Sequence, residues 1–269
     1  MINYLSLFSG IGAFEKALER LNIEFNLVGY SEIDKYASKA YSLIHNVPES
    51  KNYGDITKIN EKDIPLPLDL ITYGFPCQDI SISGKQKGLF DEGKKTRSGL
   101  FFDALRIINY TRPQIAIAEN VKNLVSKKFK DDFDTVLTSL EECGYNNYWK
   151  VLCAADYGIP QQRERVFIVS IRKDVDKGFV FPKPFSLNKT LQDIMEKKVD
   201  QKYFVKQEIT EQLLSKLRNK NISNAIRGGE RGSLDKHQWD LVAVTIRAVG
   251  DEQIERGKSN NPVGEYLSN

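Results

Sequence analysis

The sequence has little histidine, cysteine, methionine or tryptophan, and almost no excess charge. Two histidines and three cysteines in 269 residues are too few and too scattered for a disulfide framework or a structural zinc site. No apolar run reaches the roughly 20 residues of a transmembrane helix, and the chain does not open with a secretory signal. These absences exclude membrane, fibrous and disulfide-rich secreted classes, and they predict a protein without a metal site that works in the reducing cytoplasm.

Charge does not select a function either. The chain has 39 Lys and Arg against 36 Asp and Glu, a net charge of +3. Nucleic-acid binding therefore cannot be argued from net charge and needs local patches.

Apolar runs alternate with amphipathic segments through the first two thirds of the chain. We expect strands at 4–8, 25–30, 68–73, 114–118 and 166–171, and helices at 13–21, 35–45, 100–110 and 133–143. This alternation predicts an α/β protein with a doubly wound, mostly parallel sheet. A long polar segment, 74–99, is expected to be a functional loop. The pattern changes near residue 175, so we expect a catalytic domain at 1–175, followed at 176–269 by a linker and a partial recognition region.

A glycine turn, Phe8–Gly12, follows the first predicted strand and favours either a nucleotide-like ligand or simple packing. Glu32, just after the second strand, is suited to accept hydrogen bonds from ribose hydroxyls, the alternative being a helix cap there or at Asp34. Asp55 is suited to bind an adenine amino group or to shape a turn.

Further chemistry-bearing residues follow later strands. Cys77 opens the long loop after a shaped turn and is a candidate nucleophile, the alternative being a structural cysteine such as Cys143 and Cys153. Glu119 follows the fourth strand, either at a ligand crevice or as a helix cap. The alternating charges of 161–166 predict either phosphate contact and orientation of Glu119, or a surface salt-bridge cluster.

In this order, the segments resemble the bacterial cytosine-5 DNA methyltransferases. The resemblance covers residues 2 to about 173 and rests on these elements: Phe8–Gly12, Glu32, Gly54–Ile56, Gly74–Gln78, Thr96–Phe101, Glu119–Val121 and Gln161–Val166. It implies the class I S-adenosylmethionine-dependent methyltransferase fold. It also implies transfer of a methyl group from S-adenosylmethionine to carbon 5 of a cytosine flipped out of double-stranded DNA.

The resemblance also implies roles for individual residues. Cys77 would attack carbon 6, and a buried, protonated Glu119 would assist at ring nitrogen 3. Arg165 would orient the base and Glu119, and Arg163 would help hold the loop. The residues implied to bind the methyl donor are Phe8, Gly10, Gly12, Glu32, Ile33, Asp55, Ile56, Pro76 and Leu100, and those implied to bind DNA are Gln78, Ser81, Ser83 and Lys85.

Two C-terminal motifs of the family are not found: an arginine-bearing segment before a Leu-Gln-Gly-Phe-Pro-like element, and a closing Gly-Asn-Ser helix. We therefore expect a split or truncated form, with a second polypeptide supplying the rest and a restriction endonuclease as functional partner. A transfer-RNA cytosine-5 methyltransferase and a non-enzymatic subunit that binds DNA or the donor remain alternatives. A plain NAD-binding protein would leave Cys77, Glu119 and Arg165 unexplained.

Overall fold

The computed structural model describes residues 1–77, 79–80, 87–190, 192–194, 200 and 223–224. The chain forms two compact units. The first unit comprises Met1–Leu152 and Arg165–Phe181, and the second comprises Cys153–Glu164 and Pro182–Asn269. The sequence-based division into 1–175 and 176–269 stays a prediction, and most of its second part lies outside the described residues.

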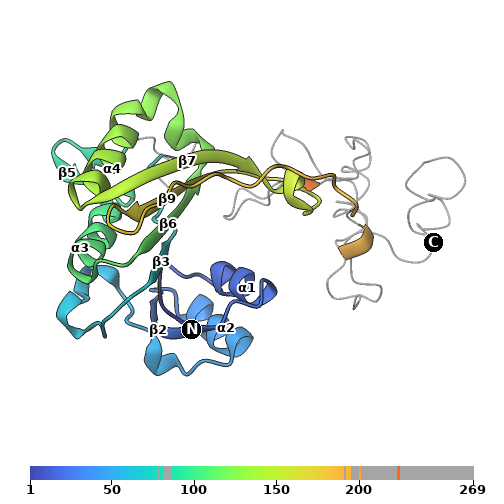
Figure 1. The fold of residues 1–269 in the computed structure, drawn as a ribbon, viewed down its shortest axis with the longest axis horizontal. Helices are drawn as coiled ribbons and strands as arrows, with labels where there is room; N and C mark the ends of the chain where they lie inside the picture. The colour runs from blue at the N-terminus through green and yellow to red at the C-terminus, as the bar shows by residue number, and fades with distance from the viewer. Residues whose placement is uncertain (78, 81–86, 191, 195–199, 201–222, 225–269) are drawn as a thin grey trace, which may run out of the picture. The chain divides into compact units, whose positions relative to one another are not determined.

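The first unit contains a six-stranded sheet in the order β2-β1-β3-β6-β9-β7 (Figure 1). Its strands are β1 Ile2–Leu7, β2 Phe25–Ser31, β3 Leu70–Tyr73, β6 Ile115–Val121, β7 Tyr145–Cys153 and β9 Glu164–Arg172. The pairs β1–β2, β1–β3 and β3–β6 are parallel, and β9 runs antiparallel to β6. The predicted doubly wound, mostly parallel sheet is confirmed.

Helices cover both faces of this sheet. They are α1 Ala13–Arg20, α2 Lys35–His45, α3 Phe101–Thr111 and α4 Lys130–Glu142. Because side chains alternate along a strand, Leu5 and Leu7 enter a core that includes Ile107 of α3, whereas Tyr4 enters the core that includes Tyr41 of α2. The connections that run between these layers place the carboxyl ends of the parallel strands at one edge.

A cluster of buried polar side chains lies between the sheet and the helices α1 and α2. The carboxylate of Glu15 is buried, and its Oε1 accepts hydrogen bonds from the hydroxyls of Tyr4 and Tyr41 at 3.1 and 2.9 Å. Burial and the neighbouring Glu15 raise the pKa of Tyr41 far above its ordinary value, so its hydroxyl remains a donor. The two phenols offset part of the cost of burying the carboxylate.

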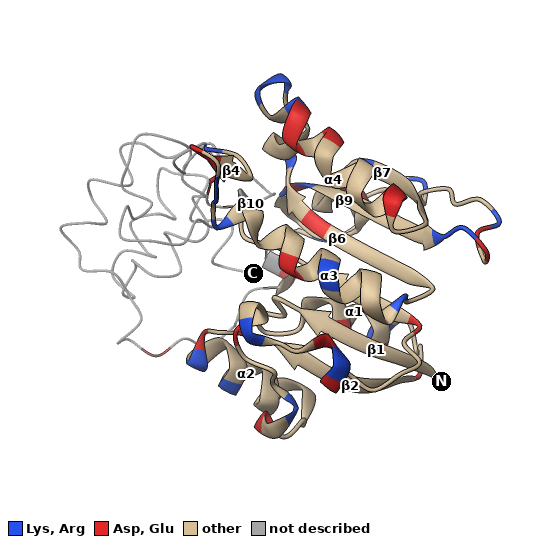
Figure 2. Cartoon of the chain, turned by 90° about the vertical axis from the view of Figure 1, so that its left-hand side faces the viewer, with Lys and Arg blue, Asp and Glu red and all other residues tan. Residues whose placement is uncertain are grey.

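Several elements were not predicted from the sequence. The strand β7 was missed, and a short hairpin, β4 Phe90–Asp91 with β5 Lys94–Lys95, lies within the segment expected to be a loop. The loop prediction is therefore wrong for 90–95. The backbone N–H of Leu89 donates to Asp132 of α4 at 2.9 Å, and the ring of Phe90 packs on Phe102 at 5.2 Å. Figure 2 shows both basic and acidic residues along the ribbon at β4.

In the second unit, two distant segments of chain are held together. Strand β8 Gln161–Gln162 pairs in parallel with β10 Ser223–Asn224. The hydroxyl of Tyr157 donates to the carbonyl of Pro182 at 3.0 Å, and its ring packs edge-on against Phe185. Within the described ranges, none of the helices is both long and apolar enough to cross a bilayer.

Candidate active site

Three segments singled out in the sequence leave neighbouring strands at the same edge of the sheet. In the parallel registers, Leu7 of β1 is paired with Tyr73 of β3, and Tyr73 with Ala118 of β6. The glycine turn follows β1, the Cys77 segment follows β3, and Glu119 lies near the end of β6. Ligands of open α/β sheets bind at this edge.

Left-handed backbone shapes the turn after β1. Phe8, Gly10 and Gly12 have φ angles of 53, 56 and 85°. A Cβ on Gly10 would meet no atom within 4 Å, whereas a Cβ on Gly12 would lie 2.1 Å from Nε2 of His45. The space at Gly10 is thus open to a ligand, and Gly12 is needed for close packing.

Glu32 is tied directly to this turn. Its Oε2 accepts a hydrogen bond from the backbone N–H of Gly10 at 2.8 Å, and its Oε1 accepts one from the N–H of Asp34 at 2.8 Å. Asp34, rather than Glu32, caps α2 by accepting from Tyr36 and Ala37. The structure therefore assigns the cap to Asp34 and leaves Glu32 facing the turn.

Asn52 is a residue that the sequence analysis missed. Its Oδ1 accepts from the backbone N–H groups of Glu32 and Gly54 at 3.0 and 2.8 Å, and its Nδ2 donates to the carbonyl of Glu32 and the hydroxyl of Ser38, both at 2.9 Å. One amide thus joins the end of β2 to the Gly54–Ile56 segment. A single asparagine in a loop carries no periodic signal that would have revealed this.

Asp55 has a local role. Its carboxylate accepts from the backbone N–H and the hydroxyl of Thr57 at 3.0 and 2.8 Å, and these bonds lower its pKa. The side chain of Ile56 is buried in the core, and Arg106 of α3 donates to the carbonyls of Ile56 and Ile59 at 2.6 and 2.7 Å. Arg106, also missed, fixes the backbone of this segment.

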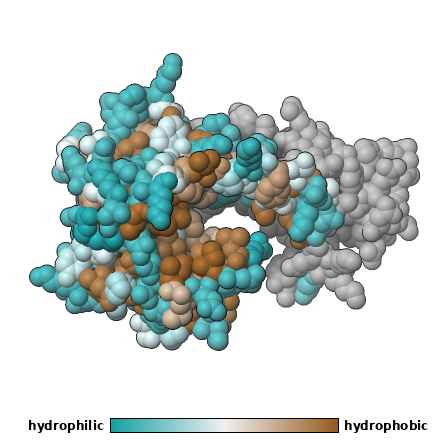
Figure 3. All heavy atoms as spheres, in the orientation of Figure 1, coloured by the Kyte–Doolittle hydropathy of each residue, from teal (hydrophilic) through white to brown (hydrophobic). Residues whose placement is uncertain are grey.

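Apolar side chains lie exposed beside the turn. Ile11 is 56% exposed and Ile33, next to Glu32, is 75% exposed. Figure 3 shows apolar surface where Figure 1 places α1 and α2. Pro76 and Leu100 are both half-buried.

The Cys77 segment is anchored to β6. Asn120, the residue after Glu119, donates from Nδ2 to the carbonyl of Phe75 at 3.2 Å, and the N–H of Ile80 donates to the carbonyl of Cys77 at 3.0 Å. Cys77 is half-buried. Because Cys143 and Cys153 are half-buried too, burial does not distinguish Cys77. What distinguishes Cys77 is its place after β3, the strand next to β6, whereas Cys153 ends β7, which β9 separates from β6.

Glu119 is ion-paired with Arg165. The guanidinium Nε lies 3.0 Å from Oε1. Val121 is paired with Arg165 in the antiparallel ladder, so Arg165 lies diagonally opposite Glu119 on the same face. The expected burial of Glu119 is not found, since 27% of its side chain is exposed.

The carboxylate of Glu119 also approaches the Cys77 segment. A Cβ built on Gly74 would lie 3.7 Å from the second carboxylate oxygen, Oε2, an ordinary van der Waals contact. One oxygen therefore faces Arg165 and the other faces the segment that leads to Cys77.

The remaining candidates fall outside the first unit or outside the described residues. Arg163 belongs to the second unit, where its carbonyl accepts from the N–H of Ala154 at 3.0 Å. The candidate DNA-binding residues Gln78, Ser81, Ser83 and Lys85 lie outside the described residues. In the part of the chain that the structure covers, no group of His, Cys, Asp and Glu residues could hold a metal ion.

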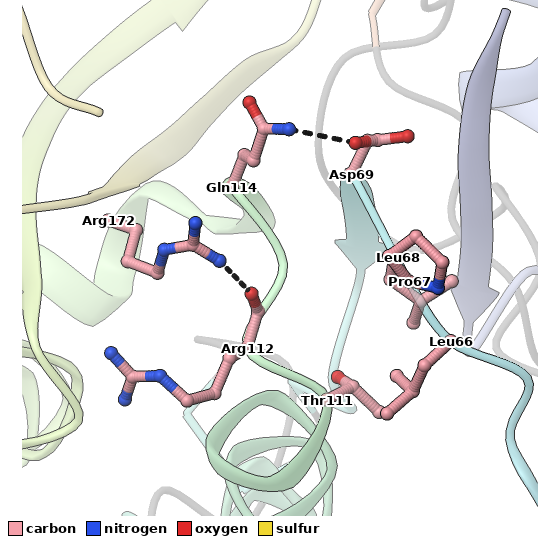
Figure 4. Close-up of a pocket in the computed structure, with 8 residues that line it drawn as sticks. All are labelled: Leu66, Pro67, Leu68, Asp69, Thr111, Arg112, Gln114 and Arg172. Atoms are coloured by element: carbon pink, nitrogen blue, oxygen red, sulfur yellow. Dashed lines mark hydrogen bonds between the residues drawn. The ribbon is translucent and has the colours of Figure 1, made fainter. Parts of the chain in front are cut away.

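A pocket of about 250 Å³ lies at the opposite edge of the sheet (Figure 4). Its walls include Asp69, which precedes β3, and Gln114, which precedes β6, and the amide of Gln114 donates to Asp69 at 2.8 Å. Arg172, at the end of β9, donates to the carbonyl of Arg112. This pocket contains none of the predicted site residues, because they follow the other ends of the strands.

Solved structures share this fold. The Dnmt2 methyltransferase of S. pombe superposes with a TM-score of 0.66 at 21% identity, over 100% of this chain and 89% of that one. A Spodoptera frugiperda DNMT2 mutant gives 0.67 at 20% identity, over 99% and 82%. At such identity these similarities concern the fold alone.

Sequence relatives are closer. The chain is 43% identical over 195 residues to the type II methyltransferase M.HhaI of Haemophilus parahaemolyticus, covering 72% of the chain and 57% of the relative. It is 37% identical to M.SsoII of Shigella sonnei (96% and 66%) and 35% identical to the orphan methyltransferase M.Rho11sI of Bacillus phage rho11s (80% and 48%). The chain thus spans about half the length of M.HhaI and M.Rho11sI. Residues 2–266 match the family described as C-5 cytosine-specific DNA methylase, and the chain belongs to that family.

Proposed function

We propose that this chain takes part in transferring a methyl group from S-adenosylmethionine to carbon 5 of a cytosine flipped out of duplex DNA. One observation carries the proposal. The Glu119–Arg165 ion pair lies against Gly74, at the base of the segment that bears Cys77 and follows β3, the strand next to β6. A nucleophile and a carboxyl group on adjacent strands are what addition to a pyrimidine ring requires.

The chain's residues would act in sequence on the base. The Cys77 thiolate forms an S–C bond to carbon 6, which places electron density on carbon 5. Glu119, carrying a proton when the base is bound, donates it to ring nitrogen 3, and Arg165 holds Oε1 so that Oε2 points toward the Cys77 segment. Bound S-adenosylmethionine supplies an electrophilic methyl group. Once carbon 5 carries the methyl group, it gives its proton to a base, the electron pair of that bond expels the thiolate from carbon 6, and ring nitrogen 3 returns its proton to Glu119.

The residues around the glycine turn fit the donor. Gly10 leaves open space, and the buried hydroxyl of Ser9 has no hydrogen-bond partner among the described residues. Glu32 presents a carboxylate suited to ribose hydroxyls, and Ile33 presents an exposed apolar side chain suited to the face of an adenine ring. Phe8, Gly12, Asp55, Ile56, Pro76 and Leu100 complete the proposed donor site.

Covalent trapping tests the proposal. Duplex DNA containing 5-fluorocytosine cannot lose a proton from carbon 5, so the donor and the chain should give a denaturation-resistant adduct. Cys77→Ser should abolish the adduct. Cys143→Ser is the matched control, because burial raises the pKa of the Cys143 thiol and keeps it protonated, and this variant should form the adduct as the wild type does.

The same assay separates the alternatives. An adduct with transfer RNA but not with duplex DNA would replace DNA by RNA as substrate. Binding of donor or DNA without any adduct would indicate a non-enzymatic subunit. Since the chain spans about half the length of relatives such as M.HhaI, each assay is run with the chain alone and with a polypeptide carrying the two C-terminal motifs not found here.

We further propose a role in restriction–modification or as an orphan methyltransferase. The type II and orphan methyltransferases among the relatives support this assignment. DNA recovered from cells that express the active protein should resist a restriction endonuclease whose cleavage is blocked by methylation of the target cytosine. Unchanged cleavage by a panel of such endonucleases would contradict the proposal.

A further inference from the structure

The imidazole of His45, at the end of α2, is enclosed between two helices and the glycine turn. Its side chain is only 3% exposed. Nδ1 lies 3.0 Å from Oε1 of Glu19 on α1, and Nε2 lies 3.1 Å from the carbonyl oxygen of Ile11 in the turn. His45 is therefore a direct contact between α2 and the backbone of the proposed donor site.

Both partners of His45 are acceptors. A carboxylate and a carbonyl have no hydrogen to donate, so both bonds form only when both ring nitrogens carry protons and the ring is a cation. Hydrogen bonds from Lys16 and His45 lower the pKa of Glu19, which keeps its carboxylate charged. The ring of Tyr41 packs on the imidazole at 4.8 Å, and the hydroxyl of Tyr41 binds the Glu15 carboxylate. The charged groups around His45 thus include Glu19, Lys16 and, through Tyr41, Glu15.

Loss of one proton would affect the two bonds unequally. A neutral imidazole has a single N–H, and the charged Glu19 is a stronger acceptor than a peptide carbonyl. The remaining proton would therefore stay on Nδ1. Nε2 would then present a lone pair to the carbonyl oxygen of Ile11 at 3.1 Å, which is repulsive.

The turn has little freedom to adjust. On one side of Ile11, Glu32 accepts a hydrogen bond from the N–H of Gly10. On the other side, Gly12 has no side chain, so its backbone packs closely against His45. We propose that His45, as a cation, is a positioning residue that fixes the turn in its donor-binding shape. Donor affinity then depends on the hydrogen bond from Nε2 of His45 to the carbonyl of Ile11. This inference rests on the proposed function, because it takes the turn as the donor site.

Two amide variants separate the two bonds. Gln places its amide nitrogen near the position of Nε2 and can donate to Ile11, whereas the shorter Asn places it near Nδ1 and can donate only to Glu19. S-adenosylhomocysteine binding to the whole chain is measured by calorimetry. Thermal unfolding of each variant is recorded, and binding is compared well below the lowest midpoint.

His45→Gln should bind as the wild type does. His45→Asn should bind about two- to tenfold more weakly, the usual worth of one hydrogen bond. Equal affinity of the two amide variants would overturn the inference. No binding by the wild type, with or without the added polypeptide, would reject the proposed function and this inference together.

Discussion

Arg165 and Glu119 lie diagonally opposite one another on the antiparallel strands β9 and β6, with Nε 3.0 Å from Oε1. The guanidinium fixes one carboxylate oxygen and leaves the other toward Gly74. Glu119→Gln should lower the rate of adduct formation about 10²- to 10⁴-fold, because the side chain can no longer deliver a proton. Single-turnover kinetics on 5-fluorocytosine DNA measure this rate.

Arg165 should act through Glu119 rather than through charge alone. Arg165→Lys keeps a cation but cannot reproduce the planar contact at Oε1, so adduct formation should slow about 10²-fold, while donor affinity stays unchanged. A lysine variant as fast as the wild type would show that charge, rather than geometry, is what Arg165 supplies.

Asn52 should stabilise the fold and the donor site together. Asn52→Ala removes hydrogen bonds to two backbone N–H groups, a carbonyl and a hydroxyl, and should lower the free energy of unfolding by about 2 kcal/mol. Asn52→Asp keeps the acceptor toward Glu32 and Gly54 but loses the two N–H donors. Its free energy of unfolding should therefore lie between those of the wild type and Asn52→Ala. Urea unfolding measures both, and equal stability of all three proteins would contradict the role of the amide.

Gly10 and Gly12 should tolerate substitution differently. Both have positive φ angles, so alanine at either should cost about 1–2 kcal/mol from backbone strain. Only at Gly12 would the new Cβ collide with His45, which should add about 1–3 kcal/mol. Thermal or urea unfolding of Gly10→Ala and Gly12→Ala gives the comparison, and a larger cost at Gly10 would be inconsistent with this packing.

Asp55 should contribute to acid sensitivity. Hydrogen bonds from the hydroxyl and backbone N–H of Thr57 lower its pKa in the folded chain. Its contribution is therefore present above the ordinary pKa of aspartate and is lost as the pH falls through the lowered value. Asn caps helical turns about as well as Asp, so Asp55→Asn should match the wild type near pH 7 and lose less stability toward about pH 3. Parallel curves for the two proteins would contradict this expectation.

The sequence predicted the layered architecture well, because its signals are periodic. The buried strands and the helices α1 to α4 repeat apolar residues at spacings of two or of three and four, and these patterns survive without knowledge of tertiary contacts. The position of Glu119 at a strand end followed from the same pattern, and the family comparisons agree with the motifs that carried the resemblance.

Features that depend on tertiary contacts were harder to predict from the sequence. The strand β7 borders the sheet and mixes apolar with polar residues, and each strand of the β4–β5 hairpin has two residues, too few for a pattern. The exposure of Glu119 was mispredicted, because the burial of a residue near a strand end depends on which other segments cover it. Asn52 and Arg106 reach segments distant in the sequence, and single polar residues of this kind give no local signal.

The hydrogen bond from Asn120 to the carbonyl of Phe75 links two parts of the proposed active site. This bond joins the strand that bears the proposed acid, Glu119, to the segment that bears the proposed nucleophile, Cys77. Both lie within a single compact unit. This bond holds the backbone two residues before Cys77 against the residue after Glu119, so part of the proposed site is organised before any nucleic acid binds.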